Sequence, residues 1–186
     1  MEALQKHERA VPQDGKDLPM TSFHITELKK FMSRLLGSDC FDSFLLAEAD
    51  IFAAAAYHID GHINRDFYTS EELADPQICP YDFSSWSAMR PICFDMIKGK
   101  RTPSHFKFVL HLMPDYVPGV LKGADSSITP DQVKALVLTV KYDGSGISLV
   151  TGTAFHSFVM DKTLDAQWDK TMRQFLAKKE IACTES

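Results

Sequence analysis

"KALVLTVKYDGSGISLVTGTAFHSFVM", residues 134–160, decides the fold class, because two apolar runs flank an Asp-Gly pair. Alternation of apolar and polar residues with a period of two is typical of strands that bury one face. Asp-Gly between such runs is a strong hairpin signal, since both residues tolerate the positive φ angles of a tight turn. We therefore expect two or three antiparallel strands here, joined first at residues 143–146, with a bulge at Gly152.

Other segments continue this pattern. "HFKFVLHLM", residues 105–113, alternates most clearly, with Phe106, Phe108, Leu110 and Leu112 on one face. "FLLAEADIF", residues 44–52, and "AAAAYHI", residues 53–59, predict two further strands. Together the segments predict an antiparallel sheet of five or more strands.

Helical periodicity separates these strands. The first expected helix covers residues 27–36, with Thr26 as its cap and Gly37 as its stop, and a short helical turn is expected at 70–74. The next helix begins at Pro91 and ends before Gly99. A short helix within 115–122, a single turn at 130–133 and a long helix over 163–180 complete the set. The last helix carries the apolar stripe Leu164, Trp168, Met172, Phe175 and Leu176, which suits it to lie across a sheet. The prediction is a single α+β domain over residues 20–182, preceded by a polar, flexible N-terminal tail over 1–19.

Composition narrows the class of protein. The chain has 186 residues, 45% of them hydrophobic, and a formal net charge of -5, which disfavours a dedicated nucleic-acid binder. Cys40, Cys79, Cys93 and Cys183 lack the paired spacing of a metal finger and are expected to be reduced thiols. No apolar run approaches the roughly 20 residues of a membrane helix, and no secretory signal is recognisable, so a cytoplasmic protein is expected.

"YHIDGHIN", residues 57–64, raises the question of a metal site. His58, Asp60 and His62 would share one face if the stretch were a continuous strand. Asp60-Gly61 instead predicts a type I′ turn over residues 59–62, which would place the two histidines on opposite faces of a hairpin. We therefore expect no metal site from this set, and no cofactor is predicted.

The segment "RPICFDMIKGKRTP", residues 90–103, together with "YDGSG" and "TGTAF", resembles an uncharacterised family of small bacterial proteins, a domain of unknown function. The likeness runs from about Met20 to Ile181. It implies a bacterial, cytosolic protein and no particular activity.

The most concentrated polar feature is "KGKRTP", residues 98–103. Lys98, Lys100 and Arg101 follow the expected helix end, where cations complement the helix dipole, so a solvated structural role is one interpretation. The other is contact with an anionic partner, in which arginine clamps a phosphate or carboxylate and the lysines act as point charges.

Evidence for catalysis is sparse. Glu48 and Asp50 share a predicted strand face, as do His105 and His111, but exposed charges on sheets are common and the two histidines stand roughly 20 Å apart. No nucleophile elbow, phosphate-binding loop or zinc motif is present. The preferred hypothesis is a non-catalytic cytosolic binding module that contacts a protein or other anionic partner through residues 98–101. The alternative is a small enzyme for an anionic or phosphorylated substrate, with a site assembled from dispersed residues.

Overall fold

The computed structural model describes residues 21–186, and the expected N-terminal tail over 1–19 lies outside them. The strands are β1 Ser22–Ile25, β2 Phe44–Phe52, β3 Ala56–Asp60, β4 Ser84–Ser85, β5 His105–Leu112, β6 Val133–Tyr142, β7 Ile147–Phe155 and β8 Cys183–Glu185. The α-helices are α1 Leu28–Gly37, α2 Ser70–Ala74, α3 Trp86–Ile97, α4 Val117–Leu121 and α5 Thr163–Lys178. Three short 3-10 turns, η1 Arg65–Phe67, η2 Pro114–Tyr116 and η3 Pro130–Gln132, complete the elements.

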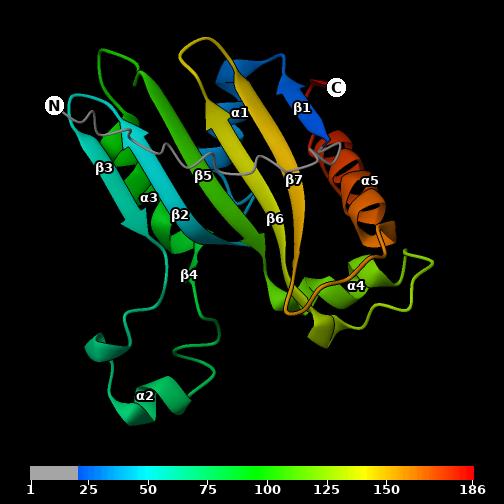
Figure 1. Ribbon diagram of the computed structural model, residues 1–186. Helices are drawn as coiled ribbons and strands as arrows, with labels where there is room; N and C mark the ends of the chain where they lie inside the picture. Colours follow the sequence, from blue (N-terminus) through cyan, green and yellow to red (C-terminus); the bar gives the residue numbers. More distant parts are fainter. Residues whose placement is uncertain (1–20) are drawn as a thin grey trace, which may run out of the picture.

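All strand pairs form one eight-stranded antiparallel sheet, with the order β3-β2-β5-β6-β7-β1-β8 and the short β4 beside β2 (Figure 1). The predicted α+β class and antiparallel pairing are confirmed. The hairpin between β6 and β7 turns at residues 143–146, where the Asp143 carboxylate accepts hydrogen bonds from the backbone N–H of Ser145 and Gly146. Gly144 takes the positive φ of 93° that this turn requires.

The core lies between the sheet and the helices α1, α3 and α5. In Figure 1, α1 and α3 lie behind the sheet, and α5 lies beside β7 and β1. Trp86 of α3 and Trp168 of α5 are fully buried, and each indole N–H donates to a backbone carbonyl oxygen, that of Leu35 and that of Val137. These bonds satisfy the polar atom that a buried tryptophan must otherwise leave unpaired.

The opposite face of the sheet carries a row of polar side chains. Strand pairing places His58, Asp50, Lys107 and Lys141 side by side on four successive strands, β3, β2, β5 and β6. Alternation along β5 explains the row, since Phe106 and Phe108 are buried while Lys107 between them is only half-buried. His111, near the end of β5, lies on the same face as Lys107.

Several predicted elements are confirmed with close boundaries. The strand over 105–112, the α5 stripe, the short helix at 70–74 and the turn at Pro130–Gln132 are all present. Both short turns have the capping boxes that their sequences indicate, Thr69 with Glu72 and Thr129 with Gln132.

Other boundaries were wrong. Helix α3 begins at Trp86, five residues before Pro91, because the Ser85 hydroxyl accepts a hydrogen bond from the Ala88 N–H and caps the helix there. Near the start of the expected helix Ile92 is 45% exposed, whereas the next residue, Cys93, is fully buried. Helix α1 has no side-chain cap, and Gly37 is its last helical residue rather than a left-handed stop. Gly152 is not a bulge, since it pairs regularly with Val137.

The predicted hairpin at residues 59–62 was also wrong. The chain turns earlier, at residues 53–55, so that β3 pairs with β2 and ends at Asp60. Gly61 has no positive φ. A glycine is needed there for a different reason, because a Cβ atom on Gly61 would lie 1.8 Å from the carbonyl oxygen of Leu46. Gly61 thus permits a close backbone approach rather than a tight turn.

Candidate functional site

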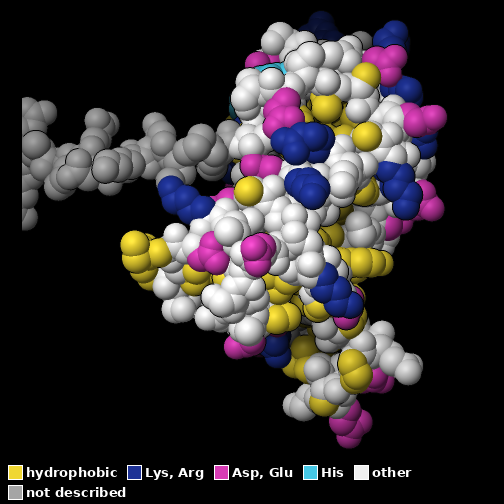
Figure 2. All heavy atoms as spheres, turned by 90° about the vertical axis from the view of Figure 1, so that its right-hand side faces the viewer, with side chains coloured by type: hydrophobic (Ala, Val, Ile, Leu, Met, Phe, Trp, Pro, Cys, Tyr) yellow, Lys and Arg dark blue, Asp and Glu magenta, His cyan; other side chains and the backbone are white. Residues whose placement is uncertain are grey.

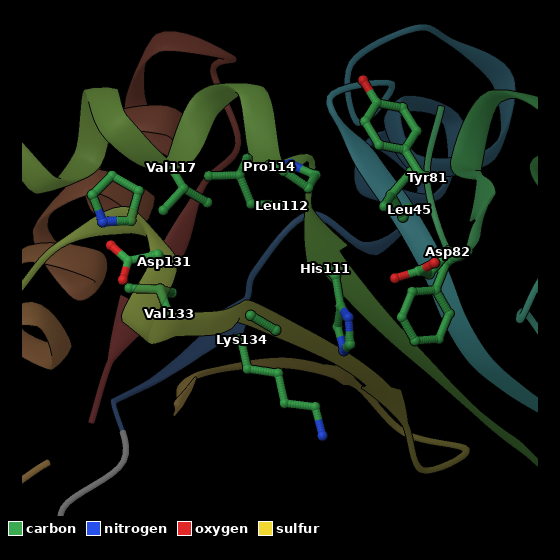
Figure 3. Close-up of a pocket in the computed structure, with 13 residues that line it drawn as sticks. Leu45, Tyr81, Asp82, His111, Leu112, Pro114, Val117, Asp131, Val133 and Lys134 are labelled. Atoms are coloured by element: carbon green, nitrogen blue, oxygen red, sulfur yellow. The ribbon is translucent and has the colours of Figure 1, made fainter. Parts of the chain in front are cut away.

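A cavity of about 380 Å³ opens at the end of the sheet where β5 finishes and β6 begins, and we call it the His111 pocket (Figure 3). Its side chains come from β2, β5 and β6, from residues 81–83, and from the turns η2, α4 and η3. The apolar lining consists of Leu45, Leu112, Pro114, Val117, Pro130, Val133 and Ala135. The remaining lining residues are Tyr81, Asp82, Phe83, His111, Asp131 and Lys134.

Two β-bulges shape the walls of this pocket. The pairing of β2 with β5 shifts register between Leu46 and Glu48. The pairing of β6 with β7 shifts between Val133 and Ala135, which makes Lys134 the extra residue. A bulge bends its strand and re-aims a side chain, and bulges are frequent beside functional sites. In Figure 3, Lys134 lies on the same side of the cavity as His111.

The third wall is the segment over residues 61–83, which crosses β2 at the first bulge. Its Gly61 N–H donates to the Ala47 carbonyl oxygen at 2.9 Å, and its Gly61 carbonyl oxygen accepts from the Ser84 N–H at 2.8 Å. These contacts hold the Phe83 ring 5.0 Å from the His111 ring, measured between centroids. The His62 ring packs on Phe83 at 4.3 Å, so the aromatic ring stands between two imidazoles.

His111 is a half-buried ionisable group of the pocket. Burial lowers its pKa below the ordinary value of 6.5, and the neighbouring His62 and Lys134 side chains lower it further. The imidazole is therefore neutral at pH 7. Within residues 21–186 neither ring nitrogen of His111 forms a hydrogen bond, so one N–H donor and one acceptor are available to a ligand.

Lys134 provides the free positive charge. Its side chain is exposed at the pocket, and it forms no ion pair with any carboxylate in the described part of the chain. Asp82 is paired with Arg65 at 3.3 Å instead. Asp131 lies at the other side of the cavity in Figure 3.

Tyr81 closes one side of the pocket. Its hydroxyl donates a hydrogen bond to the Asp115 carboxylate, which joins the 61–83 segment to the turn after β5. This bond raises the pKa of Tyr81 to about 12, so the phenol stays protonated at neutral pH. Because its proton is committed to Asp115, Tyr81 serves as a wall and not as a proton donor to a ligand.

The predicted basic loop lies at the other end of the sheet, where α3 runs into β5 (Figure 1). Lys98 forms an ion pair with Asp95 at 2.7 Å and lies close to the Phe94 ring. Its positive charge is therefore partly balanced by a residue of α3. Lys100 and Arg101 are exposed and have no ion pair in the described residues. The structure therefore separates this loop from the His111 pocket by the length of β5.

The histidines of "YHIDGHIN" have different partners. His58 Nδ1 lies 2.6 Å from Asp50, and His62 Nδ1 lies 2.6 Å from Asp60. Potential ligand atoms of Glu48, Asp50 and His58 lie within 4.8 Å of one another, a grouping across two strands that sequence reading missed. The Lys107 ammonium approaches Glu48 at 2.6 Å and Asp50 at 3.0 Å, so a lysine already supplies the positive charge there.

Sequence reading placed His111 on the polar face of its strand and gave it no role, and it missed Asp82, Asp131 and Lys134. Asp82, His111 and the Asp131–Lys134 stretch are at least 20 residues apart in the sequence. The register shift at Lys134, which helps to bring them to one pocket, has no sequence motif. Figure 2 shows the side of the molecule around α5, where acidic and basic side chains are interspersed rather than gathered.

No helix within residues 21–186 has the length and apolar character needed to cross a bilayer.

Comparison with known proteins gives one finding. No curated protein and no solved structure matches the chain. A family model, described as a family of unknown function (DUF5721), matches residues 34–184, which include the whole lining of the His111 pocket and the 98–101 loop. The chain therefore belongs to the DUF5721 family.

Proposed function

We propose that this protein binds a small organic anion in the His111 pocket, with Lys134 as the counter-charge and His111 as a hydrogen-bonding partner. One observation carries the proposal: Lys134 and His111, whose ring nitrogens are free, both line a largely apolar cavity, and no carboxylate of the described chain forms an ion pair with Lys134. An anion at that place would receive a charge-assisted hydrogen bond.

The apolar walls strengthen this interaction. Leu45 and Leu112 are 3% and 9% exposed, so part of the pocket wall consists of buried apolar side chains that form no hydrogen bonds with water. Coulomb attraction grows as the effective dielectric constant falls, so an anion whose apolar body covers these walls would displace water beside the exposed Lys134 and strengthen the pairing. A mostly apolar cavity with a few polar groups is the usual form of a small-molecule site.

The lining favours binding over catalysis. The 13 lining residues include no Ser, Thr or Cys, so the pocket offers none of the usual hydroxyl or thiol nucleophiles. No carboxylate in the described residues holds the His111 ring by a hydrogen bond, whereas a catalytic histidine is normally oriented by such a partner. These features support a binding protein rather than an enzyme that uses His111 as a general base.

The test is an NMR titration of the full chain with 3-phenylpropanoate and phenyl phosphate as probe anions. Binding should shift the His111 imidazole resonances in the parent, and Lys134→Met should reduce affinity about tenfold or more, as expected for the loss of one charge-assisted hydrogen bond. Lys141→Met is the matched control, because Lys141 is an exposed lysine at the far end of the same strand. If both variants bind like the parent, or if neither probe shifts His111, the proposal is wrong.

A second candidate function is contact with an anionic macromolecule, foremost an acidic protein surface, through the basic loop. The observation in its favour is that Lys100 and Arg101 are exposed and without ion pairs in the described chain. Loops held between rigid elements often carry recognition, and this loop joins α3 to the central strand β5. The paired variant Lys100→Ala/Arg101→Ala should keep the parent's melting temperature and lose partners recovered from lysate at low salt. An unchanged set of partners would reject this role.

A reducing compartment fits both functions. Cys40, Cys79, Cys93 and Cys183 are all free thiols, and free thiols without disulfides are typical of cytosolic proteins. We therefore include a cytoplasmic location in the proposal. Fractionation of the cells that produce the protein, followed by immunoblotting, would test it.

A further inference from the structure

We infer that the ligand of the His111 pocket is a monoanion with an apolar body, namely an aliphatic or aromatic carboxylate, and not a phosphate ester or nucleotide. The inference rests on the proposed function and narrows its ligand class. It is drawn from the number and sign of the charges around the cavity, the chemistry of its walls and its size.

The charges of the pocket suit one negative charge. Lys134 is the single cation among the 13 lining residues, and His111 is neutral at pH 7. Asp82 and Asp131 add two negative charges, of which Arg65 offsets only that of Asp82. A carboxylate would pair with Lys134, whereas the second charge of a phosphate ester would find no cation and would be repelled by Asp131.

The donors in the pocket also differ from those of a phosphate site. Phosphates are usually held by arginine forks or by several backbone N–H groups. The lining contains no arginine, and two of its backbone positions, Pro114 and Pro130, have no N–H to donate. The Lys134 ammonium and the His111 N–H are two donor groups, one for each oxygen of a carboxylate.

The walls and the volume indicate an apolar body of modest size. Seven of the lining residues are aliphatic or proline, and the aromatic ring of Phe83 covers another side. The cavity of about 380 Å³ has the volume of about a dozen water molecules. That space accommodates a short branched or phenyl-substituted chain.

The experiment compares three probes that share one apolar body: 3-phenylpropanoate, its neutral amide, and 2-phenylethyl phosphate. Affinities for the full chain are measured by calorimetry, and the His111 imidazole shift reports where each probe binds. The carboxylate should bind about tenfold more tightly than the amide, since the amide lacks the charge that pairs with Lys134, and more tightly than the phosphate. Asp131→Asn should narrow the gap between phosphate and carboxylate, because it removes the unbalanced negative charge.

The outcomes separate the two levels of the proposal. Phosphate binding as tight as carboxylate binding in the parent would overturn the ligand class and leave the pocket an anion site. Equal binding of amide and carboxylate would overturn the role of Lys134. If no probe shifts His111 in a folded parent, the proposed function itself fails. An unchanged phosphate-to-carboxylate ratio in Asp131→Asn would refute the repulsion that excludes dianions.

Discussion

Replacing Gly61 by alanine should destabilise the protein more than any other glycine-to-alanine change at a position without a positive φ. The added Cβ would lie 1.8 Å from the Leu46 carbonyl oxygen and 2.7 Å from the Leu46 carbonyl carbon. Real Cβ atoms do not approach backbone atoms closer than 3.0 Å, so the two chain segments must separate by about 1.2 Å, the difference between 3.0 and 1.8 Å. Backbone atoms on both sides make this movement costly.

The size of the effect follows from the bonds that this movement stretches. Gly61 N–H to the Ala47 carbonyl oxygen is 2.9 Å, and Ser84 N–H to the Gly61 carbonyl oxygen is 2.8 Å. Each backbone bond contributes about 0.5–1.5 kcal/mol net, and overpacking adds about 1–3 kcal/mol. The expected loss in the free energy of unfolding is therefore about 2–6 kcal/mol. At about 2–4 °C per kcal/mol for a domain of this size, the melting temperature should fall by roughly 4–24 °C.

The assay is thermal and urea unfolding, with amide hydrogen exchange as a local readout. Gly119→Ala in α4 is the matched control, because a Cβ there meets no atom within 4 Å and alanine favours a helix. If only the 61–83 segment detaches, the Gly61 and Ser84 amides should lose protection while the sheet keeps it. A Gly61→Ala protein with the parent's melting temperature and unchanged protection at both amides would show that the close approach is not as described.

Three further predictions concern single side chains. Burial holds the pKa of His111 below 6.5, so the folded protein binds fewer protons there than the unfolded chain, and the free energy of unfolding should decrease as pH falls from 6.5 to the folded pKa. In a pH series of urea unfolding curves, His111→Gln should flatten that decrease. A variant whose stability falls with pH in parallel with the parent would contradict the burial of His111. Arg90 donates to both carboxylate oxygens of Asp42 at 3.0 and 3.1 Å, and the two side chains are 21% and 27% exposed. Arg90→Lys should lose one of these hydrogen bonds and lower the free energy of unfolding by about 1 kcal/mol, as measured by chemical denaturation. An unchanged denaturation midpoint would argue against the bidentate pair. Burial raises the pKa of the Cys93 thiol to about 12. After a pulse of thiol reagent at pH 8, mass spectrometry of the native protein should therefore find Cys93 unlabelled and the less buried Cys79 labelled. Early labelling of Cys93 would place it outside the core.

Periodicity predicted the central sheet well, because its strands follow one simple rule. In β5, four apolar side chains alternate with a face that is polar except for Val109. The buried positions Phe106, Phe108, Leu110 and Leu112 are those expected from the sequence. The hairpin between β6 and β7 was equally readable, since Asp143 and Gly144 meet the chemical demands of its turn. Helix α5 was found from its stripe, which is the helical counterpart of the same rule.

The edges of the sheet were not predictable in this way. Strands β1 and β8 have four and three residues, too few for a period to be recognised, and each becomes a strand by pairing across the chain, His24 with Thr184. Asp60-Gly61 carried the same dipeptide signal as Asp143-Gly144 but has another cause, a close backbone contact. A dipeptide indicates that glycine is required, and only the neighbouring chain segment shows why.

The candidate site depends on the features that break the regular pattern. Lys134 is the extra residue of a β-bulge, so its side chain need not follow the alternation of the other β6 side chains. Without the bulge, strict alternation would continue through β6 and fix the direction of the Lys134 side chain. Without Gly61, the 61–83 segment could not lie on β2, and Phe83 would lose its place beside His111. The same atoms thus fix a local fold and build the pocket. Gly61→Ala should therefore weaken 3-phenylpropanoate binding in molecules that remain folded, whereas Gly119→Ala should not, which links the stability of the 61–83 segment to the function proposed for the pocket.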